Sequence, residues 1–162
     1  MRSTEDFEEF ARARIPHLYR TAWLLTGDRH HAEDLVQDTL ANLLRTWHKI
    51  DNPEAYARTA LVRTYISQRR RKSWSERPTA DLPETAERPG DPELRMALQS
   101  ALAELAPLDR AVLVLRFFED RSVEQVALDL GKNASAITTR TARALGRLRA
   151  VLGDGATQLT AL

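Results

Sequence analysis

Prolines cluster near the middle of this 162-residue chain, where four of its seven lie within fifteen residues. They are Pro78, Pro83, Pro89 and Pro92. Proline lacks a backbone N–H donor and disfavours helix in the residue before it, so regular structure is not expected here. Because the same stretch is rich in Asp and Glu, we predict an acidic linker over residues 73–92. This linker separates two small predicted domains, residues 1–72 and 93–152, and a short tail follows at residues 153–162.

Apolar residues in both predicted domains recur at the three- and four-residue spacing of amphipathic helices. We predict four helices in each domain, with ends marked by residues that favour caps, first turns or left-handed turns. In the first domain these are Ser3 or Thr4, Pro16 opening a second helix, Gly27, Asp28, and Asp51 or Asn52 before Pro53. The strongest periodic run predicts a buried stripe of Ala32, Leu35, Val36, Leu40, Leu43, Leu44 and Trp47. Since no segment shows the two-residue period of a strand, the predicted fold is all-α.

The net charge of +1 is the sum of blocks of opposite sign. Residues 1–54 carry a net charge of −3 and residues 55–77 carry +6, while residues 78–131 carry −6 and residues 132–162 carry +4. Two basic segments separated by an acidic one favour two local contacts with a polyanion. The alternative is that both basic segments are solvated helix faces.

Several classes of protein are disfavoured by what the sequence lacks. Without cysteine, the chain offers no disulfide, thiolate metal site or thiol nucleophile. No apolar run is long enough to span a membrane, and the acidic, polar N-terminus is unlike a signal peptide, so we expect a cytoplasmic protein. The pair His30 and His31 points in diverging directions on a helix, which favours a surface pair over a metal site. No acid–base or nucleophile constellation indicates an enzyme, and we predict no cofactor.

The segment from Ser122 to Arg149 has the pattern of a helix-turn-helix. Ser122 and Gln125 match a capping box, Gly131 allows a turn, and Asn133 or Ser135 can cap the longer helix that follows. In this motif the second helix presents its N-terminal residues to base edges in the major groove. Arg140, Arg143 and Arg147 share the face opposite the apolar stripe, which suits phosphates and bases. A tight helical hairpin with a solvated arginine face is the alternative.

A second candidate nucleic-acid site runs from Trp47 to Lys72. Aromatic residues and a loop precede a helix that ends in four consecutive basic residues. Single-stranded DNA is held by such mixtures, because bases stack on aromatic rings while cations follow the backbone. Packing of Trp47 and the tyrosines into the core explains the same pattern equally well. The face of the preceding helix that carries Asp34, Gln37 and Asp38 is most simply a solvated surface.

In their order and spacing, these motifs resemble extracytoplasmic-function RNA polymerase sigma factors over about residues 5–152. The resemblance is carried by the run from Ala32 to Leu40 (AEDLVQDTL), the proline-opened basic helix, the acidic linker, the run from Leu113 to Asp120 (LVLRFFED) and the helix-turn-helix. The segments TAWLLTGDRH from Thr21 and ISQRRR from Ile66 are similar to the actinobacterial sigma-E-type branch.

The resemblance implies that the first domain binds the clamp of the RNA polymerase β′ subunit and opens the minus-ten promoter element. The second domain is implied to read the minus-thirty-five element as duplex DNA and to meet the β flap. The implied polymerase-binding residues are Asp34, Leu35, Gln37, Asp38, Ala41 and Arg45. Those implied for the minus-ten element are Trp47, His48, Lys49, Asp51, Asn52, Tyr56, Arg58, Arg63, Gln68, Arg69 and Arg70. Those implied for the minus-thirty-five element are Lys132, Ser135, Thr138, Thr139, Arg140, Arg143 and Arg147.

The predicted function is that of a dissociable initiation subunit, which brings core polymerase to promoters and helps to melt DNA without being an enzyme. An anti-sigma protein is a further partner that the family admits, and the sequence leaves this open. A stand-alone helix-turn-helix regulator of duplex operators is the alternative, and it would bind DNA tightly without polymerase. A helical interaction protein is another, and it would lack the strong salt dependence that phosphate contacts produce.

Overall fold

The computed structural model describes residues 3–71 and 92–153, so the predicted linker up to residue 91 and the tail beyond residue 153 lie outside the described residues. Within those two ranges the chain forms helices and turns and no strand, as the sequence predicts. The first half comprises α1 (Thr4–Thr26), α2 (Arg29–Arg45), the 3-10 turn η1 (Trp47–Lys49) and α3 (Pro53–Arg71). The second half comprises α4 (Pro92–Ala103), α5 (Pro107–Leu113), the π-helical turn η2 (Val114–Phe118), α6 (Val123–Leu130) and α7 (Ala134–Leu152).

Predicted caps begin most of these helices. The Ser3 hydroxyl accepts from the Asp6 N–H at 3.2 Å, and the Asp28 carboxylate accepts from the His31 N–H at 2.8 Å. The side chains of Asn52, Ser122 and Asn133 accept equivalent bonds at the starts of α3, α6 and α7. Gly27 and Gly131 follow α1 and α6 with φ angles of 85° and 66°, a left-handed conformation that glycine adopts without a steric penalty.

The prediction that Pro16 opens a separate helix is wrong, because α1 continues through Pro16 from Thr4 to Thr26. A proline inside a helix removes one backbone hydrogen bond and crowds the preceding turn. Here the residues after Pro16 compensate by packing: Leu18, Trp23 and Leu25 are all buried. The predicted helix through Val112 and Phe118 is also modified, since it ends at Leu113 and widens into the turn η2.

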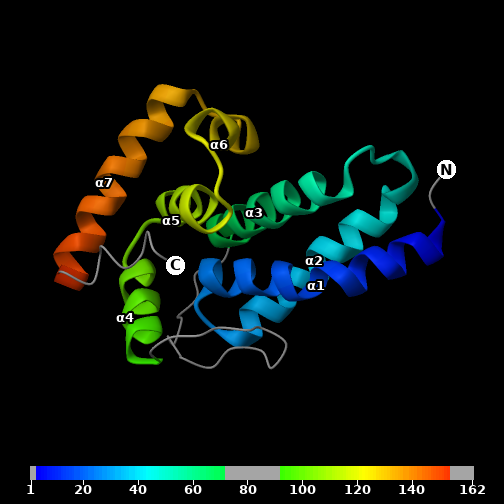
Figure 1. Ribbon diagram of the computed structural model, residues 1–162, viewed down its shortest axis with the longest axis horizontal. Coiled ribbons are helices and arrows are strands. Elements are labelled where there is room, and N and C mark those ends of the chain that lie inside the picture. The colour runs from blue at the N-terminus through cyan, green and yellow to red at the C-terminus, as the bar shows by residue number, and fades with distance from the viewer. Residues whose placement is uncertain (1–2, 72–91, 154–162) are drawn as a thin grey trace.

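The two halves share one hydrophobic core. Figure 1 shows α1, α2 and α3 as an elongated bundle, with α4, α5, α6 and α7 gathered at one end of it. Buried residues of α1 such as Trp23 and Leu25 belong to the same cluster as Leu102 of α4 and Leu115 of η2. A smaller cluster of Leu43, Trp47 and Ile50 is packed against Phe7, Phe10 and Leu40.

Candidate polymerase and nucleic-acid interface

One face of α2 carries most of the side chains implied for polymerase binding. Those of Asp34, Gln37, Asp38, Ala41 and Arg45 are all exposed. Asp38, Ala41 and Arg45 also line a groove of about 520 Å³ between α2 and α3. Across this groove the Gln68 amide donates to the Asp38 carboxylate at 2.8 Å, which ties α3 to the same surface. The arrangement offers acidic and polar groups on a rigid helix face.

Two leucines of α2 correct the sequence predictions: Leu35 was predicted both in the buried stripe and at the polymerase interface, and Leu44 only in the stripe. Leu35 is 0% exposed and belongs to the core, so it cannot contact polymerase and its assignment to that interface is wrong. Leu44, predicted in the buried stripe, is 46% exposed and lines the same groove as Ala41. A helix turns by about 100° per residue, so Leu44 lies close to Ala41, three residues before it. Arg45, the next residue, lines the same groove on this face of α2. The three-residue spacing from Ala41 was the signal that could have placed Leu44 there.

The loop implied for the minus-ten element forms a pocket of about 490 Å³ at the start of α3. Tyr56 is 39% exposed at this pocket, and its phenol oxygen accepts from the Thr46 hydroxyl at 3.4 Å. Aromatic, amide, carboxylate and ammonium groups therefore meet in one concavity, which can accept a planar polar group. Its lining residues are Thr46, Lys49, Ile50, Asp51, Asn52, Ala55, Tyr56 and Thr59. His48 is exposed in the same turn.

Trp47 does not line this pocket, and its assignment as a DNA-binding residue is wrong. Its side chain is 4% exposed and lies in the smaller core cluster. Its ring meets Phe7 edge to face with centroids 5.5 Å apart, and its indole N–H donates to the Ser3 carbonyl at 2.9 Å. The indole therefore joins η1 to the N-terminus of α1 and has no face left for a base.

The basic residues of α3 differ in their exposure and in their hydrogen-bond partners. Arg63 is exposed, but its Nε donates to the backbone carbonyl of Asp129 in α6 at 2.8 Å. Arg58 is half-buried, and its buried Nε has no hydrogen-bond partner among the described residues. Arg69 is partly exposed and Arg70 is exposed near the end of the helix. Arg63 therefore binds the second half of the chain through α6.

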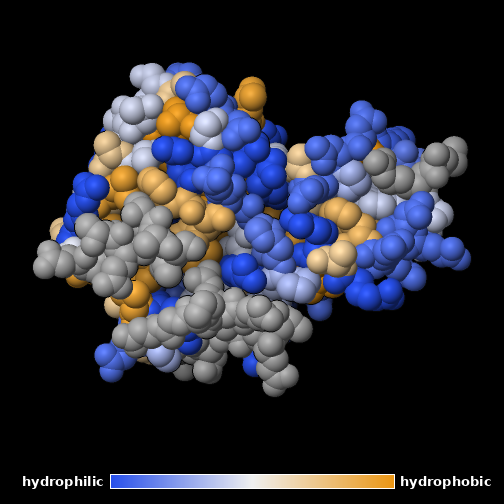
Figure 2. Space-filling model, in the orientation of Figure 1, coloured by the Kyte–Doolittle hydropathy of each residue, from blue (hydrophilic) through white to orange (hydrophobic). Residues whose placement is uncertain are grey.

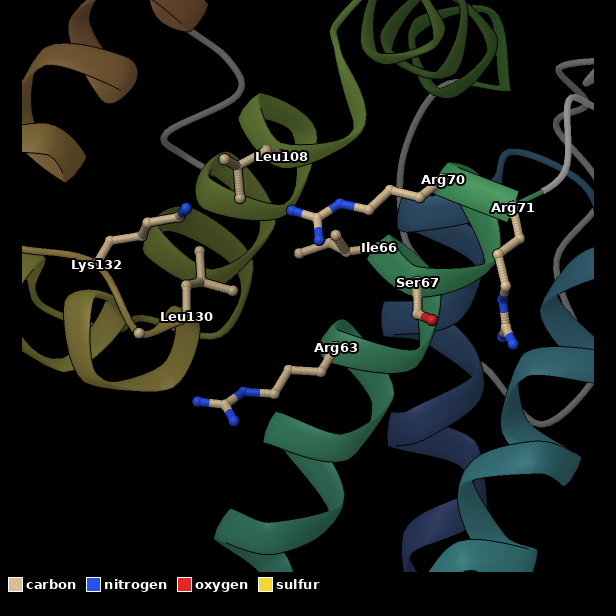
Figure 3. Close-up of a pocket in the computed structure, with 9 residues that line it drawn as sticks. Arg63, Ile66, Ser67, Arg70, Arg71, Leu108, Leu130 and Lys132 are labelled. Carbon is tan, nitrogen blue, oxygen red and sulfur yellow. The ribbon is translucent and has the colours of Figure 1, made fainter.

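Arg63 and Arg70 also line a groove of about 470 Å³, which they share with Lys132 of the α6–α7 turn. In Figure 3 the Arg70 and Lys132 side chains extend toward Leu108, whereas Arg71 points away from it. Ile66, Leu108 and Leu130 supply the apolar part of the lining. Figure 2 shows hydrophilic side chains gathered where α6 approaches the three-helix bundle. The fold therefore brings together cations implied for both promoter elements.

The helix-turn-helix forms as predicted from α6, the turn at Gly131 and α7. Ser135, Thr138, Thr139, Arg143 and Arg147 are exposed along α7. Arg140 differs from them, because it donates to the Asp109 carboxylate of α5 at 2.8 Å. Asp109 is 6% exposed, so this ion pair anchors one side of the recognition helix to the core.

Partners such as Asp109 and the Asp129 carbonyl were missed in the sequence, because they lie 31 and 66 residues from the arginines they bind. Among the described residues, no group of three or more His, Asp or Glu side chains is placed to hold a metal ion. No helix in those residues is long and apolar enough to cross a membrane.

Comparison with known proteins agrees with this geometry. A family model described as sigma-70 region 2 matches residues 10–75, and another described as sigma-70, region 4 matches residues 95–148. The chain is 36% identical to an RNA polymerase sigma-E factor of Streptomyces coelicolor, over 89% of this chain and 84% of that protein. The solved sigma factor RpoE, in complex with the anti-sigma factor NepR from Bartonella quintana, superposes with a TM-score of 0.73 and 25% identity, covering 92% of this chain and 98% of that one. The chain therefore belongs to the extracytoplasmic-function family of RNA polymerase sigma factors.

Proposed function

We propose a division of labour within this sigma factor, with polymerase binding and minus-ten recognition in residues 1–72 and minus-thirty-five recognition in residues 93–152. Sigma factors bind core RNA polymerase and promoter DNA and direct initiation, and they are not enzymes. Since transcription takes place in the cytoplasm, we place the protein there.

The exposed face of α2 is the proposed contact with the clamp of the β′ subunit. Asp34 and Asp38 supply charge on this face, and the half-exposed Leu44 supplies apolar surface beside them. A mixed surface of this kind suits a partner interface, where apolar contacts give affinity and charges fix the register.

The pocket at the start of α3 carries the minus-ten proposal. A base leaves the stack most easily where the duplex is already opening, and it is then read by hydrogen bonds and by stacking on an aromatic ring. Asn52 and Asp51 supply hydrogen-bonding groups at the pocket, and Tyr56 supplies the ring. Lys49 and the exposed His48 add cationic or polar groups for the backbone.

The exposed face of α7 is the proposed reader of the minus-thirty-five duplex. Ser135, Thr138 and Thr139 lie on its first two turns, where a recognition helix meets base edges. Arg143 and Arg147 follow on its exposed side and suit the phosphate backbone. The β flap is the proposed polymerase contact of this half.

Run-off transcription with purified core polymerase tests the assignment. Tyr56→Ala should reduce starts on duplex templates and recover on a template already unpaired at the minus-ten element, because the loss is in capturing the opened strand. Arg143→Ala should weaken upstream recognition and leave core binding intact, while Arg149→Ala, on an exposed α7 position outside the proposed site, is the matched control. Loss of core binding in Arg143→Ala would show that the two halves have been assigned the wrong way round. Tight polymerase-independent binding to duplex DNA would favour a stand-alone regulator instead.

An anti-sigma protein is also a proposed partner. The solved relative that matches across 92% of this chain is a sigma factor in complex with an anti-sigma factor. Co-purification of the chain with its genomic neighbours is the direct test.

A further inference from the structure

The recognition helix α7 is tied to α5 by an ion pair between Arg140 and Asp109. The Arg140 Nη1 donates to the Asp109 carboxylate at 2.8 Å, and the Asp109 side chain is only 9% exposed. The Arg140 side chain is 33% exposed, so part of its guanidinium remains open to solvent. A guanidinium has five N–H donors, and this bond uses one of them. The ion pair therefore holds Arg140 and leaves it further donors for another acceptor.

Both ends of this ion pair lie on backbone that the core holds in place. On α7, Ile137 lies three residues before Arg140 and is 0% exposed. On α5, Asp109 precedes the buried Arg110, whose Nη2 donates to the Gln99 side chain of α4 at 2.9 Å. Because neither helix can shift without breaking these contacts, the ion pair fixes the direction of the Arg140 guanidinium.

Arg140 lies on the flank of α7 that faces α5. A recognition helix lies in the major groove, where its outer face meets base edges and the phosphate strands pass on either side. Thr139 is exposed on the outer face, whereas Asp109 holds Arg140 toward α5. The accessible part of the Arg140 guanidinium therefore suits a phosphate, with which arginine forms strong charge-assisted hydrogen bonds.

Asp109 affects such a phosphate contact in two opposite ways. Its negative charge repels a phosphate that approaches Arg140, and water and salt screen this repulsion at the protein surface. Its hydrogen bond orders the guanidinium before DNA binds, which avoids the entropy cost of ordering a long side chain during binding. Ordering one such side chain in advance corresponds to about a two- to tenfold gain in affinity. We therefore expect the ordering to outweigh the screened repulsion.

We propose that Asp109 is a positioning residue for promoter recognition, which orients Arg140 toward a phosphate of the minus-thirty-five duplex. The inference rests on the proposed function, because it assumes that α7 reads this duplex. Asp109 is buried and acts through Arg140. Removal of its carboxylate therefore weakens upstream recognition, although it takes a negative charge away from a DNA-binding domain.

Promoter binding by the holoenzyme tests this proposal. The full chain is assembled with core polymerase and titrated onto a promoter that the unaltered holoenzyme selects from a genomic pool. A second titration uses the same promoter with a scrambled minus-thirty-five element, and the ratio of the two affinities measures upstream recognition. Asp109→Asn should lower this ratio by about two- to tenfold. Simple loss of a repulsive charge would instead raise the affinity for both promoters.

Two other acidic residues of the second half are matched controls. Glu124→Gln removes an exposed charge from α6. Glu119→Gln removes a buried one, because the Glu119 side chain is 9% exposed and accepts from His17 at 2.9 Å and from the Thr21 hydroxyl at 2.5 Å. Burial raises the pKa of Glu119, but these hydrogen bonds and the charges of His17 and Arg58 bring it below its ordinary value. Both controls should keep the upstream ratio, although Glu119→Gln should lower the melting temperature.

A double-mutant cycle tests whether Asp109 acts through Arg140. Arg140→Gln should lower the upstream ratio and reduce the slope of log affinity against log salt by about one. Adding Asp109→Asn to Arg140→Gln should then lower the ratio no further, because the two residues share one contact. Arg140→Lys keeps the charge but lacks the planar fork of donors, so it should also lower the ratio without any change at Asp109.

Core-binding titrations and far-UV circular dichroism establish that each variant is folded and assembled. An unchanged or raised ratio in folded Asp109→Asn would overturn the proposal. Additive losses in the double variant would do the same, as would an Arg140→Lys variant that matches the unaltered chain. A ratio near one with the unaltered chain is a different result, because it would refute the proposed reading of the minus-thirty-five element before any variant is compared.

Discussion

Replacing Trp47 separates a core role from a role in DNA binding. Trp47→Phe keeps an aromatic ring against Phe7 and Phe10 and removes the indole N–H that binds the Ser3 carbonyl. The lost hydrogen bond corresponds to about 0.5–1.5 kcal/mol of unfolding free energy. Trp47→Ala, which also leaves a cavity in the small cluster, should cost about 3–5 kcal/mol. Against a typical stability of about 5–15 kcal/mol, the Phe variant remains folded.

Urea unfolding followed by far-UV circular dichroism measures these losses without relying on the fluorescence of the residue that is replaced. The Phe variant should have a lower unfolding midpoint and normal run-off transcription at saturating polymerase. Tyr56→Ala should behave in the opposite way, because Tyr56 is partly exposed and stacking of one base is worth about 1–3 kcal/mol. A Trp47→Phe variant with an unchanged midpoint and transcription as low as that of Tyr56→Ala would refute the core assignment.

Two of the three other predictions use matched pairs of variants. Gly131→Ala should destabilise the protein by about 1–2 kcal/mol, since Gly131 has a φ angle of 66°. Gly146→Ala, inside α7, should stabilise it by about 0.5–1 kcal/mol. Neither new methyl group meets an atom within 4 Å, and thermal melts of the two variants compare their stabilities. Leu44→Asp should weaken binding to core polymerase by about tenfold. Leu128→Asp, at a position 79% exposed on α6, should leave that binding unchanged. A titration of the labelled chain with polymerase measures both affinities. Because the pKa of Glu119 is lowered by folding, its stabilisation is complete above its ordinary value of 4.5 and is lost as the pH falls below it. The difference in unfolding free energy between the unaltered chain and Glu119→Gln should therefore shrink below pH 4.5, and a constant difference would exclude the charge as its cause.

Most local features of the fold were predictable because they depend on residues close together in the chain. Caps at Ser3, Asp28 and Ser122 each need a donor only three residues away. The failures came where packing decided between two local possibilities. Pro16 is tolerated inside α1 because the helix beyond it is buried. Leu44, predicted in the buried stripe, is exposed because the faces of α2 that meet α1 and α3 are set by the bundle.

By itself, the sequence determined that the described residues are helical and that a helix-turn-helix lies in their second half, while the proline-rich linker, which lies outside those residues, stays a prediction. Helical period, capping residues and proline act through the backbone within a few residues, so the order of residues is sufficient to specify them. Only the tertiary structure decided that the two halves share a core. It also decided that the Trp47 side chain is buried in the smaller cluster of the first half. The bond from Arg110 to Leu24 joins residues 86 apart, and that from Thr21 to Glu119 joins residues 98 apart. Nothing in the local pattern distinguishes a buried arginine or glutamate of this kind from a solvated one, because its partner is chosen by the packing of the whole chain.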